Sequence, residues 1–416
     1  MKRFLCVFII TWAVVFCGKC FAEDNWTVNT IVYGMESLPS VAVDTNNMPI
    51  IAASVPDGQN IFLIIQTPVG YKVNEIPDTD MGWVTSFKIT SNNELALTYT
   101  RYGSSGTWYG SKGSWFDWVF DEVAPQGQSY YPDMDLTSKD IPHIAYFNGS
   151  SGYVEHAVFD VHSQQWIKEP LTGFGIATPF YYTSIDIASD DKIMVCSSNN
   201  MDILVAIQQH GFWNYLPAIN VGSVPLGLHC SFTADNLPAI AYIIQGMLYY
   251  AVYINDIIGW VKTSVSPAFV DRPSYSVSLT HSLTGITGIA YIDENKIRYA
   301  TNIDAGWTTT EIDAVGHYPD LIFDHNDKPL IVYSSYNNCV GMPVLKLAGI
   351  GLEEFNIADL NNDKLVNFKD FAIMADHWMT ILPEPDLKIG DFNQNAKVDA
   401  LDLKWLCCNW LEGTTP

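Results

Sequence analysis

The amino-acid sequence predicts a mainly β fold made of repeats, followed by a small α-helical unit. The chain has 416 residues, of which 48% are hydrophobic, 13% aromatic and only 16% charged. An aromatic residue recurs at intervals of 45, 47, 48, 47, 47 and 47 residues, at Trp26, Tyr71, Trp118, Trp166, Trp213, Trp260 and Trp307. A second motif follows each of them, such as LPSVAVDTNNMPIIAAS from Leu38 and YPDLIFDHNDKPLIVYS from Tyr318. Four β-prone runs per 40–50 residues indicate a β-propeller, here with seven blades.

Each repeat contains the strands of one blade. The motif is made of two apolar, β-prone runs joined by a polar turn of Asp, Asn, Ser and Lys, which is a hairpin signature. A third apolar run follows, such as IFLIIQ from Ile61, and in the second repeat it is less distinct, between Trp108 and Trp118. The strand at the aromatic residue is the fourth. We therefore expect residues 23–350 to form the propeller.

The order of the runs predicts how the ring closes. If the first strand of the motif is innermost, the strand at the aromatic residue is the outermost strand of the preceding blade. The strand from Trp26 to Val32 then completes the blade formed by residues 318–348. Such pairing protects an otherwise open sheet edge.

The N-terminal segment has the pattern of a secretion signal. Lys2 and Arg3 precede an apolar run from Phe4 to Phe16, and Cys20-Phe21-Ala22 offers a cleavage site after a small residue. The apolar run is shorter than the roughly 20 residues that span a bilayer. We expect residues 1–22 to be a signal peptide, and the mature chain to be secreted or at the cell surface, without a transmembrane anchor.

Charge and cysteine content narrow the class of protein. The net charge is −24, and removal of the three cations in residues 1–22 lowers it to −27. An acidic field repels phosphates, so no nucleic-acid partner is expected. Five cysteines stay in the mature chain: Cys196, Cys230, Cys339, Cys407 and Cys408. Their odd number and spacing argue against a disulfide framework or a zinc motif. Cys196 and Cys230 are expected to be buried, and adjacent Cys407 and Cys408 are not expected to bond to each other.

Few propeller residues are candidates for a site. Because the repeated aromatic residues occur in all seven copies, packing between blades is favoured over a ring of sugar-stacking platforms. Better candidates break the repeat, namely Arg101, Trp108, Tyr109, Trp115, His143, His156, His229, Arg272 and Arg298. Aspartates near the repeat turns are expected to cap the turns: Asp133, Asp135, Asp186, Asp320 and Asp324. No GxGxxG, P-loop, HExxH, GxSxG or sialidase Ser-x-Asp-x-Gly-x-Thr-Trp motif occurs. Catalytic residues therefore stay unassigned, although paired carboxylates are the groups that glycosidases use.

After Ala348 the strand pattern gives way to two loop–helix units. Oxygen ligands occupy loop positions 1, 3, 5, 7, 9 and 12, where position 7 offers its main-chain carbonyl. They are Asp359, Asn361, Asp363, Leu365, Asn367 and Asp370 in the first loop, and Asp391, Asn393, Asn395, Lys397, Asp399 and Asp402 in the second. This oxygen-rich set suits calcium, which takes 6–8 hard ligands. The sequence predicts two Ca²⁺ sites.

These two units, 32 residues apart, resemble the type I dockerin module. The resemblance covers about 60 of the 416 residues, within a predicted domain at 351–416. Dockerins carry Asp at position 12 and bind cohesin modules in a calcium-dependent way, so the resemblance implies a cohesin-type partner. Val366 and Val398 at position 8 are expected to pair the loops. Trp378 and Trp410 match each other in the two helices and are expected to pack in the core.

The loops depart from the dockerin pattern at two places. Position 6, usually Gly because the backbone turns sharply there, is Lys364 and Ala396. Calcium affinity is expected to be reduced, most in the second loop, where Asn395 replaces Asp. Partner choice of dockerins resides largely in positions 10 and 11, and these are Phe368-Lys369 and Ala400-Leu401 here.

Three functions fit the sequence. The first is a secreted propeller that binds a polysaccharide, glycoprotein or other protein and is attached to an extracellular assembly by its calcium-dependent module. The second is a propeller glycoside hydrolase or polysaccharide lyase that carries a dockerin and degrades polysaccharide. The third is a pure scaffold whose C-terminal module only stabilises the chain. The missing catalytic motifs favour the first.

Overall fold

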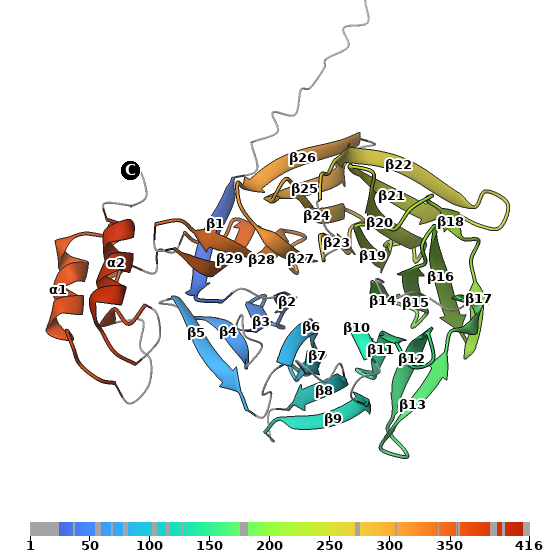
Figure 1. Cartoon of the computed structure of the whole chain (residues 1–416), viewed down its shortest axis with the longest axis horizontal. Coiled ribbons are helices and arrows are strands. Elements are labelled where there is room, and N and C mark those ends of the chain that lie inside the picture. Colours follow the sequence, from blue (N-terminus) through green and yellow to red (C-terminus); the bar gives the residue numbers. More distant parts are fainter. Residues whose placement is uncertain are drawn as a thin grey trace, which may run out of the picture.

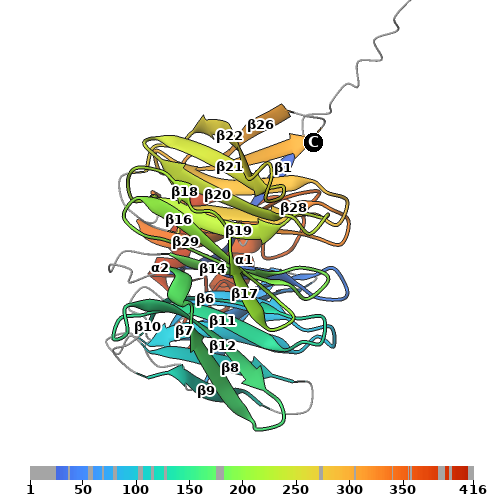
Figure 2. The ribbon, with the colours of Figure 1, turned by 90° about the vertical axis from the view of Figure 1, so that its right-hand side faces the viewer.

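Seven antiparallel sheets surround a central axis in the computed structural model of the chain (Figure 1). The structure describes residues 25–35, 38–54, 60–67, 70–77, 82–101, 106–113, 117–125, 129–174, 182–270, 275–303, 306–339, 341–354, 356, 358–382, 389–392 and 396–410. The predicted signal peptide lies outside them. Seen from its edge, the ring is a disc (Figure 2). The predicted seven-bladed β-propeller is confirmed.

Blades 1 to 6 have four main strands in chain order from the axis outward. Blade 1 contains β2 (Ser40–Val43), β3 (Pro49–Ser54), β4 (Ile61–Thr67) and β5 (Gly70–Ile76). Blade 2 contains β6 (Gly82–Ile89), β7 (Leu95–Arg101), β8 (Thr107–Lys112) and β9 (Val119–Ala124). Blade 3 contains β10 (Ser129–Leu136), β11 (Pro142–Asn148), β12 (Tyr153–Asp160) and β13 (Gln165–Pro170).

The next three blades follow the same order. Blade 4 contains β14 (Thr183–Ile187), β15 (Ile193–Ser198), β16 (Asp202–Gln209) and β17 (Phe212–Tyr215), after the short helix η1 (Thr172–Phe174) and with β18 (Ile219–Asn220) paired to β16. Blade 5 contains β19 (Gly227–Phe232), β20 (Pro238–Ile244), β21 (Met247–Tyr253) and β22 (Trp260–Pro267). Blade 6 contains β23 (Val277–His281), β24 (Thr287–Asp293), β25 (Lys296–Ile303) and β26 (Gly306–Asp313).

Blade 7 closes the ring as the sequence predicts. Its inner strands are β27 (His317–Phe323), β28 (Pro329–Asn337) and β29 (Met342–Ile350), and its outermost strand is β1 (Trp26–Tyr33). β1 pairs antiparallel with β29, with Trp26 opposite Ile350. The first strand of the chain therefore covers the edge that blade 7 would otherwise expose.

The hairpin turns between the first and second strands of the blades explain why polar residues recur at the same place in the repeats. In blade 1 the Asn47 N–H donates to the Asp44 carbonyl at 2.9 Å, and the Asp44 N–H donates to Met48 at 3.0 Å. Asn47 adopts a left-handed φ of 65°, and equivalent residues do the same: Asn93, Asp140, Asp191, Asn236 and Asp327. Asn and Asp tolerate this conformation better than other residues with a Cβ. The turn composition therefore fixes the inner hairpin of most blades.

The hydrophobic core lies between blades, and the repeated aromatic residues contribute to it. Four of them pack edge-on against a ring on the third strand of the preceding blade, with ring centroids 5.1–5.2 Å apart. The pairs are Trp26–Tyr299, Trp166–Tyr109, Trp213–His156 and Trp307–Tyr250. Edge-to-face contact is the favoured geometry for aromatic pairs. At these four positions the packing interpretation is confirmed.

Two helices follow the propeller, α1 (Phe368–Asp376) and α2 (Ala400–Cys408). They share a core with the end of blade 7, in which Trp405 of α2 is 1% exposed and its ring lies 3.5 Å from that of Tyr33. Val366 and Val398 are both buried in this core. Neither α-helix in the described part of the chain has the length and apolar character to cross a membrane.

A disulfide joins the two parts, and the spacing of the cysteines does not predict it. Cys339, in the turn between β28 and β29, bonds to Cys408 at the end of α2, with the Cα atoms 6.0 Å apart. Cys196 and Cys230 are buried and free, as predicted, and Cys407 is exposed and free. The residue numbers gave no sign of the bond, because 69 positions separate the two cysteines.

Candidate functional site: the central cavity and the calcium loops

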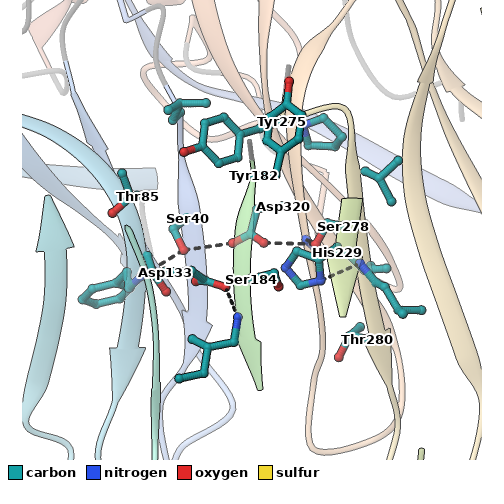
Figure 3. A pocket seen from close by; sticks show the side chains of 18 of the residues that line it. Ser40, Thr85, Asp133, Tyr182, Ser184, His229, Tyr275, Ser278, Thr280 and Asp320 are labelled. Carbon is teal, nitrogen blue, oxygen red and sulfur yellow. Dashed lines mark hydrogen bonds between the residues drawn. The ribbon is translucent and has the colours of Figure 1, made fainter. Parts of the chain in front are cut away.

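The inner strands of the seven blades surround a cavity of about 170 Å³ on the propeller axis. Tyr182 and Tyr275 lie at one end of it, and Asp320, Ser40, Ser278 and His229 lie below them (Figure 3). Of the repeat-breaking residues that the structure describes, His229 reaches this cavity.

A closed ring of hydrogen bonds, which we call the belt, connects neighbouring blades around the cavity. At the same register position of every inner strand, a polar side chain bonds to the backbone of the next blade at 2.9–3.3 Å. The pairs are Ser40–Phe87, Ser86–Met134, Asp133–Ile185, Ser184–Cys230, His229–Leu279, Ser278–Leu321 and Asp320–Val41. Six accept from a backbone N–H, and Ser86 instead donates to a carbonyl. The belt therefore satisfies inner-strand backbone groups that have no further strand to pair with.

A second row lies two residues further along each inner strand and carries an ion pair. The Lys88 ammonium lies 3.2 Å from Asp135, and the Lys88 side chain is 37% exposed, so water reaches this part of the channel. Burial alone lowers the pKa of Lys88, but the surrounding carboxylates, Asp135 foremost, hold it above its ordinary value. Asp186 of the same row accepts from the Phe232 N–H.

The expectation that the repeat aspartates cap turns is wrong for four of the five. Asp324 alone caps its turn, by accepting from Asn326 N and Lys328 N at 2.8 Å. The others bond to the backbone of a neighbouring blade, and all but Asp135 line the central cavity: Asp133, Asp135, Asp186 and Asp320. Burial raises the pKa of Asp133, Asp186 and Asp320. Spacing placed these residues near turns, but only the fold turns them toward the axis.

Two of the repeat-breaking histidines meet in blade 3. His143 Nδ1 lies 2.8 Å from His156 Nε2, and His156 Nδ1 lies 3.1 Å from Glu169. The Trp213 indole N–H, from blade 4, donates to the same Glu169 oxygen at 2.8 Å. Burial, together with His156, lowers the pKa of His143 to about 3. This chain of polar groups, buried at the two histidines and partly exposed at Glu169, links two blades at a distance from the central cavity.

The other repeat-breaking residues that the structure describes are held by separate partners. The Arg101 guanidinium lies 3.9 Å above the Trp108 ring. Arg298 pairs with Asp293 at 2.9 Å and with Glu311 at 3.3 Å. Tyr109 packs on Trp166. Trp115 and Arg272 lie outside the described residues. These side chains therefore do not form one site.

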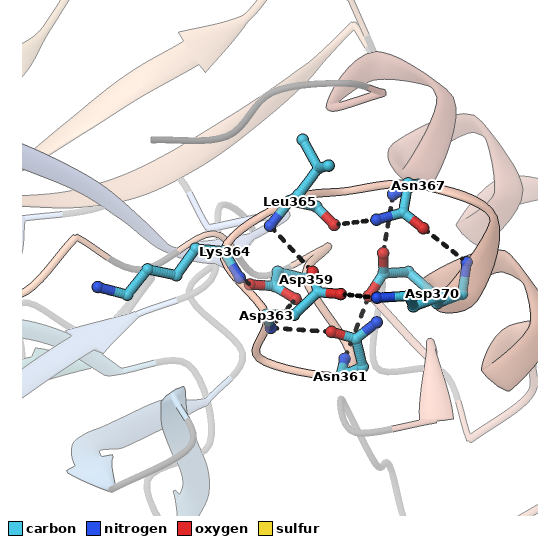
Figure 4. Close-up of polar contacts among 8 residues, drawn as sticks. Asp359, Asn361, Asp363, Lys364, Leu365, Asn367 and Asp370 are labelled. Atoms are coloured by element: carbon cyan, nitrogen blue, oxygen red, sulfur yellow. Dashed lines mark hydrogen bonds and ion pairs between the residues drawn. The ribbon is translucent and has the colours of Figure 1, made fainter. Parts of the chain in front are cut away.

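The first calcium loop brings its oxygen atoms together (Figure 4). Asp370 is fully buried and accepts from the backbone N–H groups of Asn361 at 3.1 Å and Asn367 at 2.8 Å. Asp359 accepts from Lys364 N at 2.6 Å and from Asp363 N at 3.1 Å. Asn367 and Asp370 also form the capping box of α1. Positions 9 and 12 therefore fix both the loop and the start of the helix.

The donor set of this loop fits a hard cation, with two competing contacts. The loop offers side-chain oxygens and the Leu365 carbonyl, although the Asn367 side-chain amide donates to that carbonyl at 2.9 Å. A buried carboxylate such as Asp370 is costly without a partner charge. Burial raises the pKa of Asp359, with Asp370 and Asp363 adding to the effect. Lys369 Nζ lies 2.6 Å from Asp363. In the described residues no three carboxylate, imidazole or thiol groups converge into a metal-binding group by themselves, so amide and carbonyl oxygens have to complete the set.

The second loop is described in part. Asp391 and Asp402 are fully buried, and Asp399 N donates to Asp402 at 2.9 Å in the capping box of α2. Lys397 pairs with Asp399 at 3.2 Å. Asn393 and Asn395 lie outside the described residues.

Position 6 of both loops has a left-handed backbone. Lys364 has φ 68° and Ala396 has φ 62°. Glycine adopts this conformation without an energetic penalty, whereas a residue with a Cβ is strained in it. Lys364 and Ala396, which stand where dockerins usually have Gly, therefore each place strain in their loop.

The matched tryptophans of the helices differ in their surroundings. Trp410 packs against the shared core and lies edge-on to Phe368 at 4.9 Å. Trp378 is 40% exposed and lies outside this cluster. The packing expectation holds for Trp410 and is wrong for Trp378, because α2 faces the propeller and α1 does not.

Comparison with known proteins identifies the C-terminal unit and supports the propeller fold. Residues 357–407 match the dockerin type I domain. No curated protein matches the chain. The structure of virginiamycin B lyase from Staphylococcus aureus is similar at 13% identity and a TM-score of 0.55, over 79% of this chain and all of that one. The polysaccharide lyase Uly1 is similar at 9% identity and a TM-score of 0.50, over 76% of this chain and 90% of that one. At these identities the two likenesses concern the fold.

Type I dockerin domains bind calcium and attach proteins to cohesin-bearing extracellular assemblies. The chain is a seven-bladed β-propeller followed by a dockerin type I domain at residues 357–407.

Proposed function

We propose that this protein is a secreted binding subunit of a cohesin-bearing assembly, held there by a dockerin with two calcium ions. The carrying observation is the dockerin match over the two oxygen-rich loops. The twelve ligand positions of the sequence reading are the proposed calcium ligands. The propeller is the part that binds the ligand, and residues 1–22 direct export of the chain.

The cohesin-type partner docks on the face of α1. Phe368 and Phe371 lie about one turn apart on α1, Trp378 lies two residues beyond its end, and the three side chains are 76%, 36% and 40% exposed. α2 is not equivalent, because Trp405 packs on Tyr33 and Cys408 is bonded to the propeller. The two repeats of the module are therefore similar in sequence and different in accessibility, which favours a single docking orientation.

The disulfide supports export. Disulfides persist in oxidising compartments and are rare in the cytosol. Cys339–Cys408 joins two parts of the chain at the surface of blade 7. Isolation of the natural protein tests this: it should begin near residue 23, and its intact mass should show one disulfide.

The propeller is proposed to bind carbohydrate without cleaving it. Support comes from the missing catalytic motifs and from the mixture of aromatic and polar side chains around the axis. A glycan array with the mature protein, run beside incubations analysed for released sugar, tests this. Binding without release supports the proposal. Release of oligosaccharide would instead identify a polysaccharide-degrading enzyme.

The docking claim is tested with purified type I cohesin modules immobilised on a biosensor. We expect binding in calcium, no binding after EDTA, and a large loss in Phe368→Ala. The matched control is Leu401→Ala, which alters an exposed apolar residue in the second repeat. Equal loss in both variants would contradict docking through α1.

A further inference from the structure

We infer that the central cavity binds one neutral, ring-sized polyol, such as a single pyranose unit of a glycan. This inference names the ligand class and the site of the proposed carbohydrate binding and rests on that proposal. The size of the cavity is the first support. A cavity of about 150 Å³ accepts benzene, and a cavity of about 170 Å³ therefore admits about one six-membered ring.

The belt contains ionisable side chains at positions where a hydroxyl would be enough to connect the blades. Ser40, Ser184 and Ser278 satisfy a neighbouring backbone N–H with a hydroxyl at 3.0–3.2 Å. At the same register position, Asp133, His229 and Asp320 do so with ionisable groups. The serines act as a comparison within the molecule: a hydroxyl is sufficient for the belt. Asp320 uses its further acceptor capacity within the belt, because it also accepts from the Ser40 and Ser278 hydroxyls. Asp133 and His229 keep acceptor or donor capacity beyond their belt contact.

This capacity is specific for each group. A carboxylate accepts about four hydrogen bonds, and the two Asp133 oxygens accept one backbone N–H each, from Met134 and Ile185. His229 Nδ1 accepts from Leu279 N at 3.3 Å. The neutral imidazole therefore carries its proton on Nε2, where it is a donor. Both kinds of group that a sugar hydroxyl needs line the same cavity.

A buried hydroxyl in the cavity wall lacks a partner. Thr183 is 3% exposed, and its Oγ1 has no hydrogen-bond partner among the described residues. Thr183 also lines the cavity. A buried unsatisfied hydroxyl costs about 1–3 kcal/mol. A ligand hydroxyl would satisfy it.

Tyrosines lie at one end of the cavity, and two tyrosines of the inner strands, Tyr131 and Tyr318, have a strained backbone. Tyr182 and Tyr275 lie edge-to-face at 5.7 Å, and Tyr131 contacts both at 6.1 Å. Tyr131 and Tyr318 have φ values of 53° and 55°, each at a register shift of its inner strand. A positive φ is a real outlier for a bulky residue, and such strain gathers at functional sites. The aromatic faces offer an apolar surface to the C–H face of a sugar ring.

The charged groups of the cavity wall favour a neutral sugar over an anionic one. The cavity wall carries three carboxyl groups, those of Asp133, Asp186 and Asp320, and the Lys88 ammonium, which pairs with Asp135. A uronic acid would have to place its carboxylate beside these acidic groups, while Lys88 is already paired. Most of the carboxylate oxygens already hold backbone N–H groups, so the cavity favours hydroxyl donors of a neutral sugar.

Calorimetry with the full mature protein in calcium tests the inference. The probes are neutral monosaccharides, a uronic acid and tetramethylammonium. We expect a neutral sugar to bind, Thr183→Val to weaken binding about five- to tenfold, and Tyr275→Ala to abolish it. The matched control is Thr301→Val, because Thr301 is a buried hydroxyl without a partner in the described residues on β25. Near-UV circular dichroism confirms that each variant is folded.

Each outcome decides the inference. Preference for the uronic acid or for tetramethylammonium overturns it, as does equal weakening in Thr183→Val and Thr301→Val. If polysaccharides bind on the array while Thr183→Val and Tyr275→Ala leave that binding unchanged, the inference fails and the carbohydrate-binding proposal stands. If no saccharide binds at all, both fail, while the dockerin claim is still read from calcium-dependent cohesin binding.

Discussion

The disulfide between Cys339 and Cys408 should hold the dockerin domain folded against the propeller, and Cys408→Ser measures how strongly. Cross-linking a chain stabilises the fold mainly by reducing the freedom of the unfolded state, by an amount that rises with the logarithm of loop length. The bond spans 69 residues. The chain-entropy relation for such a loop gives about 4 kcal/mol at 25 °C.

The effect should be local, because the propeller is closed independently by β1 and the belt. Hydrogen exchange of the α2 amides is therefore the suitable assay. A loss of about 4 kcal/mol predicts roughly thousandfold faster exchange, since about 1.4 kcal/mol corresponds to a factor of ten. Amides of β19 to β21, in blade 5, should keep their protection.

Cys407→Ser is the matched control. Cys407 neighbours Cys408 and is exposed and free, so its replacement changes the same helix end without opening a cross-link. It should leave the exchange rates of α2 within a fewfold of the unmodified protein. Unchanged α2 exchange in Cys408→Ser, or the same acceleration in both variants, would refute the assigned role of the bond.

Three further predictions concern other parts of the molecule. Lys364→Gly removes the strain of a left-handed residue with φ 68°, and this strain is worth about 1–2 kcal/mol. Calorimetry should therefore show several-fold tighter calcium binding in this variant. Weaker binding would contradict this prediction. Asp320→Ala removes the acceptor of the Val41 N–H and of the Ser40 hydroxyl. It should lower the free energy of unfolding by about 2–4 kcal/mol, because buried donors lose a charged partner. An unchanged urea midpoint would show that the belt does not stabilise the propeller. His143 has a folded pKa of about 3 against about 6.5 unfolded, so the unfolded state binds the proton first and stability falls as the pH drops from about 6.5 toward 3. The loss at pH 5 is about 2 kcal/mol, and His143→Asn should lower the acid-unfolding midpoint; an unchanged midpoint would show that His143 does not contribute.

The repeat made much of the fold predictable. Aromatic residues about 47 positions apart give the number of blades, and the polar turns between apolar runs give the inner hairpins, in which Asn47 and its counterparts take the left-handed conformation. These signals are local, since turn chemistry and strand alternation depend on neighbours in the chain. The closure by β1 followed from the order of the runs alone. The two oxygen-rich loops were equally apparent, because the proposed ligands of each ion lie within twelve residues.

The candidate site of the propeller was not predictable in the same way. Asp320 bonds to Val41 across 279 positions, and Asp133 and Asp186 were read as turn caps because each lies a few residues from a turn. Which face of an inner strand meets the axis depends on bulges such as those at Tyr131 and Tyr318, where the register shifts. Sequence spacing alone carries no information on that rotation.

By itself, the sequence determined the seven blades, the strand that closes the ring, the paired oxygen-rich loops and the dockerin resemblance, because each arises from residues close together in the chain or from a period that repeats. Only the tertiary structure decided that channel aspartates connect blades, that Cys339 meets Cys408, and that α2 rather than α1 is covered by the propeller. These contacts join residues tens to hundreds of positions apart. Their energies depend on where a closed ring of blades places side chains, and that placement exists only once all seven blades have packed.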